Sequence, residues 1–157
     1  MSSDIKEEFW KALAKSPILM VRREGSADHA LPMAAQLDEK LGPAYGGAVW
    51  FFTQRDNRLA PGGPAMAQFM SRDHELFACV AGNLVEETDN EVIDRFWTNP
   101  VAAWFECRED PALLVMRMDL EDIEIWTADM SIAGRLKLMI GSKVDESERG
   151  EHARVSV

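Results

Sequence analysis

Thr53, Asn57 and Arg58 are the side chains in this sequence whose types and spacing best suit the recognition of an anion. They follow an apolar stretch, 48–52, which itself comes after Gly46 and Gly47. A hydroxyl and an amide can offer hydrogen bonds, and a guanidinium offers a planar charged fork that fits phosphate. The simpler interpretation is a core strand that leaves into an ordinary polar loop, and this stretch taken alone favours it.

Other titratable side chains give weaker indications of chemistry. His29 and His74 flank apolar segments in polar company, and neither is assigned an acid or base role. Cys79 lies in an apolar run, which suits a small core residue, whereas Cys107 beside Arg108 could be a slightly activated thiol. Two cysteines cannot complete a zinc site unaided.

An acidic cluster follows the apolar run 112–118. It has four carboxylates without the spacing of a calcium loop, so we expect a solvated turn there; they are Asp119, Glu121, Asp122 and Glu124. No Gly-x-Gly-x-x-Gly, Walker loop or Gly-x-Ser-x-Gly occurs, which removes several nucleotide-binding and hydrolase classes.

Composition predicts one soluble domain. The chain has 157 residues, 46% hydrophobic and 28% charged, which is ordinary for a globular protein. Its net charge of -10 repels the nucleic-acid backbone, so we expect no nucleic-acid partner. No apolar run is long enough to cross a bilayer, and the N-terminus does not resemble a signal peptide. We therefore expect no membrane partner and a cytoplasmic location with reduced thiols.

The first half of the chain predicts one helix and then strands. An amphipathic helix is expected over 3–15, ended by Ser16-Pro17, and a hairpin is expected from a strand at 18–21 and a second strand over 29–37. Pro32 cannot donate to a ladder, which places an edge or a bulge there. The stretch 48–52 predicts a strand buried on both faces, and 65–72 a short helix with Met66, Phe69 and Met70 inward.

The second half predicts further strands around a helical interruption. A strand at 76–81 is followed by the turn signal Gly82-Asn83, with 84–86 pairing back. Thr88 or Asp89 should cap a helix that Asn99-Pro100 closes, and 101–105 should form a helical turn. Strands are expected at 112–118 and 123–127, a last helix at 131–140, and a polar, loose end over 141–157. Consecutive strands with short turns indicate a mainly β protein with peripheral helices, built on an antiparallel sheet or barrel.

Seven segments follow one another in an order and spacing that a known family shares. They are His29-Ala30-Leu31-Pro32-Met33, Val49-Trp50-Phe51-Phe52-Thr53, Asn57-Arg58, Phe96-Trp97-Thr98-Asn99-Pro100, Ala103-Trp104-Phe105, Glu109-Asp110-Pro111 and Glu124-Ile125-Trp126. Together they resemble the general stress protein 26 branch of the pyridoxamine 5'-phosphate oxidase-like flavoproteins. The likeness runs from about Phe9 to Trp126, and each motif is weak alone, but their order and spacing make chance agreement improbable.

The resemblance implies an antiparallel split β-barrel over the single domain 1–157, with a core of about 9–127 and a C-terminal helix and tail at 131–157. It also implies a homodimer that holds FMN in two grooves at the subunit interface. Trp104 is expected near the flavin ring or at the dimer contact, while Trp50, Trp97 and Trp126 are expected to pack in the core or interface. Carried over to this sequence, the cofactor-binding residues are Leu31, Pro32, Met33, Ala34, Phe52, Thr53, Asn57, Arg58 and Trp104.

The sequence departs from the family pattern at several positions. Leu31 stands where the family usually has arginine, which removes a charge-assisted phosphate contact of order 1–3 kcal/mol. Arg58 replaces the usual lysine and keeps the charge, whereas 61–64 interrupts what is normally a helix. The C-terminal Arg-x-His of true pyridoxamine 5'-phosphate oxidases has no counterpart after Trp126, so that activity is not expected.

Three functions therefore stay open. The leading one is an FMN-binding flavoprotein, with oxidoreductase activity as the reaction class that the cofactor would support. The alternative is a split-barrel binding or structural dimer that has lost flavin, for which Leu31 and the Pro-Gly-Gly-Pro segment are the reasons. A third is a split barrel that uses another flavin-like or haem cofactor, since the same phosphate turn would serve related ligands.

Overall fold

The structure, a computed structural model, describes residues 2–127, 141 and 151–157. Two short 3-10 turns, Glu39–Leu41 and Tyr45–Gly47, lie between the second and third strands. The helices and strands are, in chain order, α1 (Ser2–Lys15), β1 (Ile18–Arg23), β2 (Leu31–Ala34), β3 (Ala48–Gln54), β4 (Gly63–Met70), β5 (Leu76–Glu86), α2 (Asn90–Phe96), α3 (Asn99–Ala102), β6 (Leu113–Thr127) and β7 (His152–Ser156).

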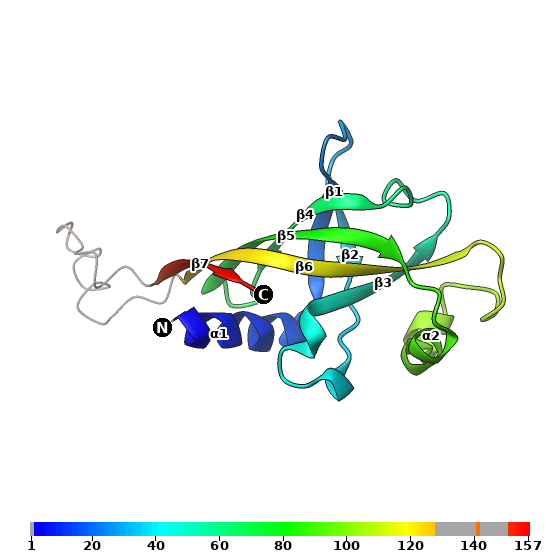
Figure 1. Cartoon of the computed structure of the whole chain (residues 1–157), viewed down its shortest axis with the longest axis horizontal. Coiled ribbons are helices and arrows are strands. Elements are labelled where there is room, and N and C mark those ends of the chain that lie inside the picture. The colour runs from blue at the N-terminus through cyan, green and yellow to red at the C-terminus, as the bar shows by residue number, and fades with distance from the viewer. Residues whose placement is uncertain (1, 128–140, 142–150) are drawn as a thin grey trace.

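The strands form one antiparallel sheet in the order β2-β1-β4-β5-β6-β3, with β7 paired to β6 (Figure 1). The two outermost strands of this order, β2 and β3, approach each other where Gln36 and Trp50 form an isolated antiparallel bridge. The bridge has two backbone hydrogen bonds, of 2.7 and 3.0 Å. The sheet thus curls until its two edges meet at one point, which confirms the predicted split-barrel class.

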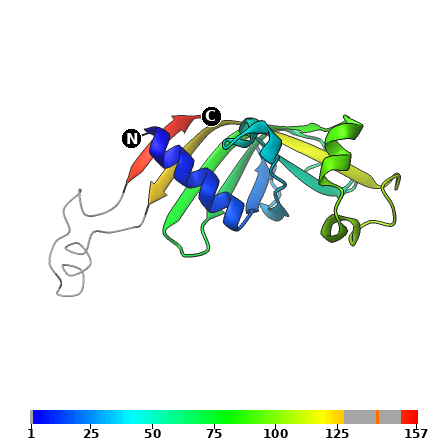
Figure 2. The same ribbon diagram turned by 90° about the horizontal axis from the view of Figure 1, so that it is seen from below.

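The main core lies between this sheet and α1, which rests against the face formed by β5, β6 and β7 (Figure 2). Ile5, Phe9 and Leu13 recur at helical spacing and are buried at 0–1% exposure against inward-facing strand residues. Phe9 makes an edge contact with Phe69 of β4, at 6.0 Å between ring centroids. The helix predicted over 3–15 is therefore confirmed, and its apolar face fills the barrel.

A second apolar cluster covers the other face of β3 and β6. It joins Trp50 and Val115 to Ile93 and Phe96 of α2, and the rings of Trp50 and Phe96 lie 5.2 Å apart. Both faces of β3 are therefore covered, as the apolar run 48–52 predicts. Asp89 caps α2 by accepting a hydrogen bond from the Glu91 backbone N–H at 2.9 Å, so the second of the two predicted caps is the one used.

The helix predicted over 65–72 is wrong, because residues 65–70 belong to β4 and Arg72 lies in the turn that follows it. Ala65, Ala67 and Phe69 are buried while their neighbours are more exposed, which is the period of two of a strand. β4 begins immediately after Gly62, at Gly63, and both have positive φ angles. Asn99-Pro100 was predicted to close the helix before it. In the structure α2 ends at Phe96, and Asn99 and Pro100 begin a separate helix, α3, where proline suits the first turn.

The hairpin turn predicted at Gly82-Asn83 is also wrong, because β5 runs straight through both residues. The register with β6 shifts between Ala81 and Gly82, which marks a bulge. A Cβ on Gly82 would lie 2.5 Å from the Asp119 carbonyl oxygen, so glycine permits the close approach of the two strands. A Gly-Asn dipeptide is compatible with either a hairpin turn or a β-bulge. Here β5 pairs with β4 on one side and β6 on the other, and this pairing produces the bulge.

The two predicted strands at 112–118 and 123–127 are one strand, β6, so the acidic stretch between them is not a turn. Its outward carboxylates pair with neighbouring cations: Asp119 with Arg117, and Asp122 with Arg154. The end of the chain, predicted to be loose, forms β7 from His152 to Ser156. The predicted helix at 131–140 lies outside the described residues. Among the helices that the structure describes, none is long and apolar enough to span a membrane.

Candidate functional site

Six of the nine predicted cofactor residues lie on β2 and β3, and Asn57 and Arg58 lie in the turn after β3. The facing edges of β2 and β3 are held together at both ends. The Gln36–Trp50 bridge holds one end. At the other end, Nη1 of Arg58 donates a hydrogen bond to the His29 carbonyl oxygen at 2.9 Å. The β2–β3 ladder does not continue between these two points, so backbone groups of 31–34 and 52–54 remain along an open seam. We call this feature the β2–β3 seam.

Asn57 organises the turn that carries Arg58. Its Nδ2 donates to Oγ1 of Thr53 at 2.8 Å, and its Oδ1 accepts from the Leu59 backbone N–H at 2.8 Å. Its own backbone N–H bonds to the Gln54 carbonyl at 2.9 Å. The amide thus fixes the Thr53 hydroxyl and orders the turn on either side of Arg58, while its contact with a ligand stays a prediction.

Thr53 and Arg58 have hydrogen-bonding capacity left for a ligand. The Thr53 hydroxyl accepts from Asn57 and keeps its own hydrogen to donate. Arg58 is exposed, and the bond to His29 uses one of the five N–H donors of its guanidinium. A donor hydroxyl and a fork with open donors at the seam fit a phosphate group.

The side chains of β2 point alternately to the inner and the outer face of the sheet. Met33 is buried at 6% exposure and Leu31 packs against the main core, while Pro32 and Ala34 point outward. Met33 therefore offers a ligand its backbone and not its side chain. Leu31 carries no charge, so Arg58 is the one cationic side chain among the nine predicted cofactor-binding residues. β2 is an edge strand with proline at its second residue, as predicted.

Phe52 and Trp104 lie apart from the rest of the predicted set. Neighbouring strand residues point to opposite faces, and Phe52 packs towards Trp97 with ring centroids 6.2 Å apart, away from the face of Thr53. Phe52 and Thr53 therefore present their side chains to opposite faces of β3, and a contact between Phe52 and a ligand stays a prediction. Trp104 follows α3 and is 80% exposed, so it is not core, and its place relative to a flavin stays a prediction.

A charged cluster behind β3 was not predicted from the sequence. Glu87 is nearly buried and accepts hydrogen bonds from Trp50 Nε1 at 2.9 Å and Arg117 Nη1 at 3.3 Å. Burial alone raises the pKa of Glu87, but bonds from Trp50, the Asp89 backbone N–H and Arg117 outweigh it and lower that pKa. The cluster fixes the Trp50 indole, and with it the middle of β3. Nothing local in the sequence separates Glu87 from its exposed neighbour Glu86.

A second buried ion pair, between Asp38 and Arg95, joins the loop after β2 to α2. Asp38 is 4% exposed and also accepts from the Lys40 backbone N–H at 3.1 Å. The pair therefore ties the segment between β2 and β3 to the helical layer.

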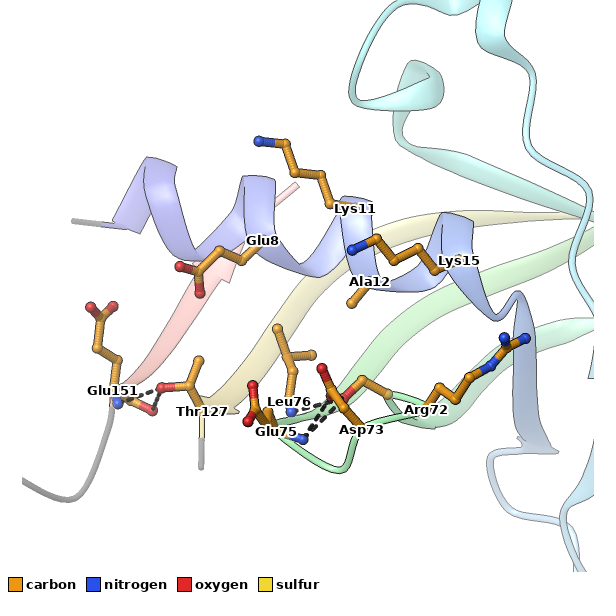
Figure 3. Close-up of a pocket in the computed structure, with 11 residues that line it drawn as sticks. Glu8, Lys11, Ala12, Lys15, Arg72, Asp73, Glu75, Leu76, Thr127 and Glu151 are labelled. Carbon is orange, nitrogen blue, oxygen red and sulfur yellow. Dashed lines mark hydrogen bonds between the residues drawn. The ribbon is translucent and has the colours of Figure 1, made fainter. Parts of the chain in front are cut away.

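Two cavities lie away from the seam. The larger, about 790 Å³, opens between α1 and the turn that joins β4 to β5, and its lining includes Lys11 and Lys15 of α1 and Asp73 and Glu75 of the turn (Figure 3). The smaller, about 280 Å³, lies beside Glu87 and α2. None of the predicted cofactor residues lines either one. In the described part of the chain, no cluster of three or more His, Cys, Asp or Glu side chains could hold a metal ion.

Comparison with protein families agrees with the split-barrel fold. The family model described as "Pyridoxamine 5'-phosphate oxidase like" matches residues 4–149, most of the chain. The chain belongs to this family. The sequence has no significant match among curated proteins.

Solved structures of family members are similar over most of their length. The general stress FMN/FAD binding protein of Xanthomonas citri is 39% identical, with 83% of this chain and 93% of that chain covered and a TM-score of 0.73. A general stress family protein of Xanthomonas campestris pv. campestris is 38% identical, with 84% and 92% covered and a TM-score of 0.74. A Jannaschia sp. CCS1 protein assigned to general stress protein 26 is 26% identical, with 99% of each chain covered and a TM-score of 0.78. These similarities support the general stress protein 26-like branch that the motifs resemble.

Proposed function

We propose that this protein binds FMN at the β2–β3 seam, with two copies of the chain forming the site. The observation that carries the proposal is the Thr53–Asn57–Arg58 arrangement, in which the Asn57 amide holds the Thr53 hydroxyl and a bond to the His29 carbonyl holds the Arg58 guanidinium near the open edge of β2. The Xanthomonas citri relative, described as an FMN/FAD binding protein, supports a flavin as the ligand class.

Each residue has a distinct part in this proposal. Arg58 would bind the phosphate by charge-assisted hydrogen bonds, and the Thr53 hydroxyl would donate a further one. Asn57 would position the Thr53 hydroxyl and order the turn that carries Arg58. Pro32 and Ala34 are small and point outward, so they would let a flat ring approach the strand closely.

A bound flavin would supply hydride or electron transfer, so oxidoreductase activity is the reaction class we propose. The chain's own contribution would be the phosphate clamp and the surface against which the ring lies. No catalytic residue is assigned.

Titration with FMN, followed by flavin absorbance after dialysis, tests the proposal. Arg58→Ala should weaken FMN affinity by about ten- to a hundredfold, since a hydrogen bond to a charged group contributes about 1.5–3 kcal/mol. Arg55→Ala is the matched control. Arg55 also lies in the turn after β3, but it pairs with Glu86 at 3.1 Å and is not assigned to the ligand. Equal affinities in the two variants would contradict the proposed clamp.

The flavin-free dimer is the second candidate, and Leu31 is the observation that favours it. A protein that stays colourless after incubation with FMN would support this alternative. Leu31→Arg would then test whether the missing cation is the cause, because recovery of flavin absorbance is expected if it is.

A further inference from the structure

Strand β7 lies at a margin of the sheet (Figure 2). Among the described residues its one strand neighbour is β6, with His152 opposite Trp126 and Ser156 opposite Asp122. The outer side of an edge strand presents backbone N–H and C=O groups that no strand pairs, and such a row is a template for pairing with another chain. An exposed edge of this kind is therefore expected to carry some protection against association.

The hydrogen bonds to β6 show which backbone groups of β7 face outward. At one end of the ladder the Thr127 N–H donates to the Glu151 carbonyl at 2.7 Å, and at the other the Val157 N–H donates to the Glu121 carbonyl at 3.0 Å. Residues of an antiparallel strand bond alternately to one side and to the other. The odd-numbered residues of 151–157 therefore bond to β6. The residues whose backbone groups face away from β6 are His152, Arg154 and Ser156.

Lys6 of α1 occupies one of these outward groups. Its Nζ donates a hydrogen bond to the Ser156 carbonyl oxygen at 2.7 Å, although the two residues are 150 positions apart in the sequence. The Lys6 side chain is half-buried, so its ammonium is held against the edge of β7. Within the described part of the chain, no hydrogen bond reaches the outward backbone groups of His152 and Arg154. The edge is thus open along two residues and closed by a cation at the third.

A second copy of the chain would pair with this edge through its own β7, antiparallel and centred on Arg154. The same residues would then be used on both copies, as an isologous contact requires. The His152 N–H of one copy would need the Ser156 carbonyl of the other, which is the acceptor that Lys6 occupies. Pairing would also enclose the Lys6 ammonium between the two edges, and burying a charge without a partner is costly.

We propose that Lys6 protects the open edge of β7 from pairing with a second copy of this chain. Lysine is a residue that natural proteins place at sheet edges for this purpose. Here it comes from a helix and acts on a backbone acceptor of the edge itself. The inference is independent of the proposed function, because none of the predicted cofactor residues lies on β7 or α1. It concerns association beyond whatever assembly the wild type forms.

Sedimentation velocity of the full chain over a range of concentrations tests the proposal. Lys6→Met removes the ammonium and keeps a long side chain, so species larger than those of wild type should appear at a concentration roughly tenfold or more lower. Lys6→Arg keeps the charge and should sediment as wild type. Lys11→Met is the matched control, because Lys11 is also on α1 but pairs with Glu7 at 3.7 Å. Circular dichroism checks folding, and Lys6→Ala is the second variant if Lys6→Met does not fold.

Proline at position 154 tests whether β7 is the surface that associates. Arg154→Pro removes an N–H that faces away from β6, so it blocks pairing at the edge and leaves the β6 ladder intact. Added to Lys6→Met, it should restore the sedimentation of wild type. Arg154→Ala is its control, because it also loses the pair with Asp122 but keeps the N–H, and it should not restore wild-type behaviour.

Two results would overturn the proposal. One is a folded Lys6→Met or Lys6→Ala protein that sediments as wild type at every concentration. The other is association of the Lys6→Met protein that Arg154→Pro and Arg154→Ala change equally. FMN titration of the same variants separates this inference from the proposed function: loss of flavin binding in wild type refutes the flavin site and leaves the comparison of sedimentation unaffected.

Discussion

Replacing Glu87 by glutamine should lower the free energy of unfolding by about 1–2 kcal/mol at pH 7. The carboxylate accepts hydrogen bonds from Trp50 Nε1 at 2.9 Å and Arg117 Nη1 at 3.3 Å, and its burial keeps water from replacing them. Glutamine keeps an acceptor for Trp50 but loses the charge. Hydrogen bonds to charged groups contribute about 1 kcal/mol more than neutral ones. The partly exposed Arg117 adds no more than about 1 kcal/mol, because solvent screens it.

The free energy of unfolding lost in Glu87→Gln should depend on pH, and the pKa of Glu87 defines the direction. Burial alone raises the pKa of Glu87, but its hydrogen bonds hold that pKa below the ordinary value of 4.5. A lowered pKa in the folded state means that the carboxylate stabilises the protein above about pH 4.5, and that this stabilisation fades as pH falls through the folded value. The difference between wild type and Glu87→Gln should therefore be full at pH 7 and shrink as the pH falls below 4.5.

Urea unfolding at pH 7 and at pH 4, followed by circular dichroism and tryptophan fluorescence, measures both effects. Glu86→Gln is the matched control: it is the preceding residue, it is exposed, and its pair with Arg55 is a surface one that contributes about 0–1 kcal/mol. The reasoning would be refuted if the two variants lost the same stability, or if the Glu87→Gln deficit stayed constant into acid.

Two further predictions concern local structure. Asp89→Ala should lower the free energy of unfolding by about 1 kcal/mol through loss of the α2 cap, whereas Thr88→Ala should change it little; thermal unfolding measures both, and equal losses would contradict the capping assignment. Gly82→Ala should destabilise the protein by about 1–3 kcal/mol, because its Cβ would lie 2.5 Å from the Asp119 carbonyl oxygen. Unchanged urea unfolding of Gly82→Ala would show that the bulge does not need glycine.

Part of the candidate site could be predicted from sequence because its signals are local. The change from an apolar strand to hydroxyl, amide and guanidinium groups places Thr53, Asn57 and Arg58 within a few residues of one another. Chain connectivity alone then keeps them close. The anchor of Arg58 could not be predicted in this way, because it is a backbone carbonyl, of His29, which carries no residue-specific signal.

The helical pattern of α1 and the apolar run of β3 were sufficient to predict both elements, since each depends on which of its own residues avoid water. The paths of β5 and β6 depended on tertiary structure, because Gly82-Asn83 and the acidic stretch after Met118 suit turns as well as strands. Pairing with neighbours on both sides decided for strands. Tertiary structure also decided β7, whose polar residues pair with β6 although they come much later in the sequence.

The sequence by itself determined the residue types available to bind an anion and the elements that carry them. Only the tertiary structure decided that Phe52 and Thr53 face apart, that Glu87 is buried beneath Trp50, and that β2 and β3 meet at a seam, because strand register and burial are properties of the whole sheet.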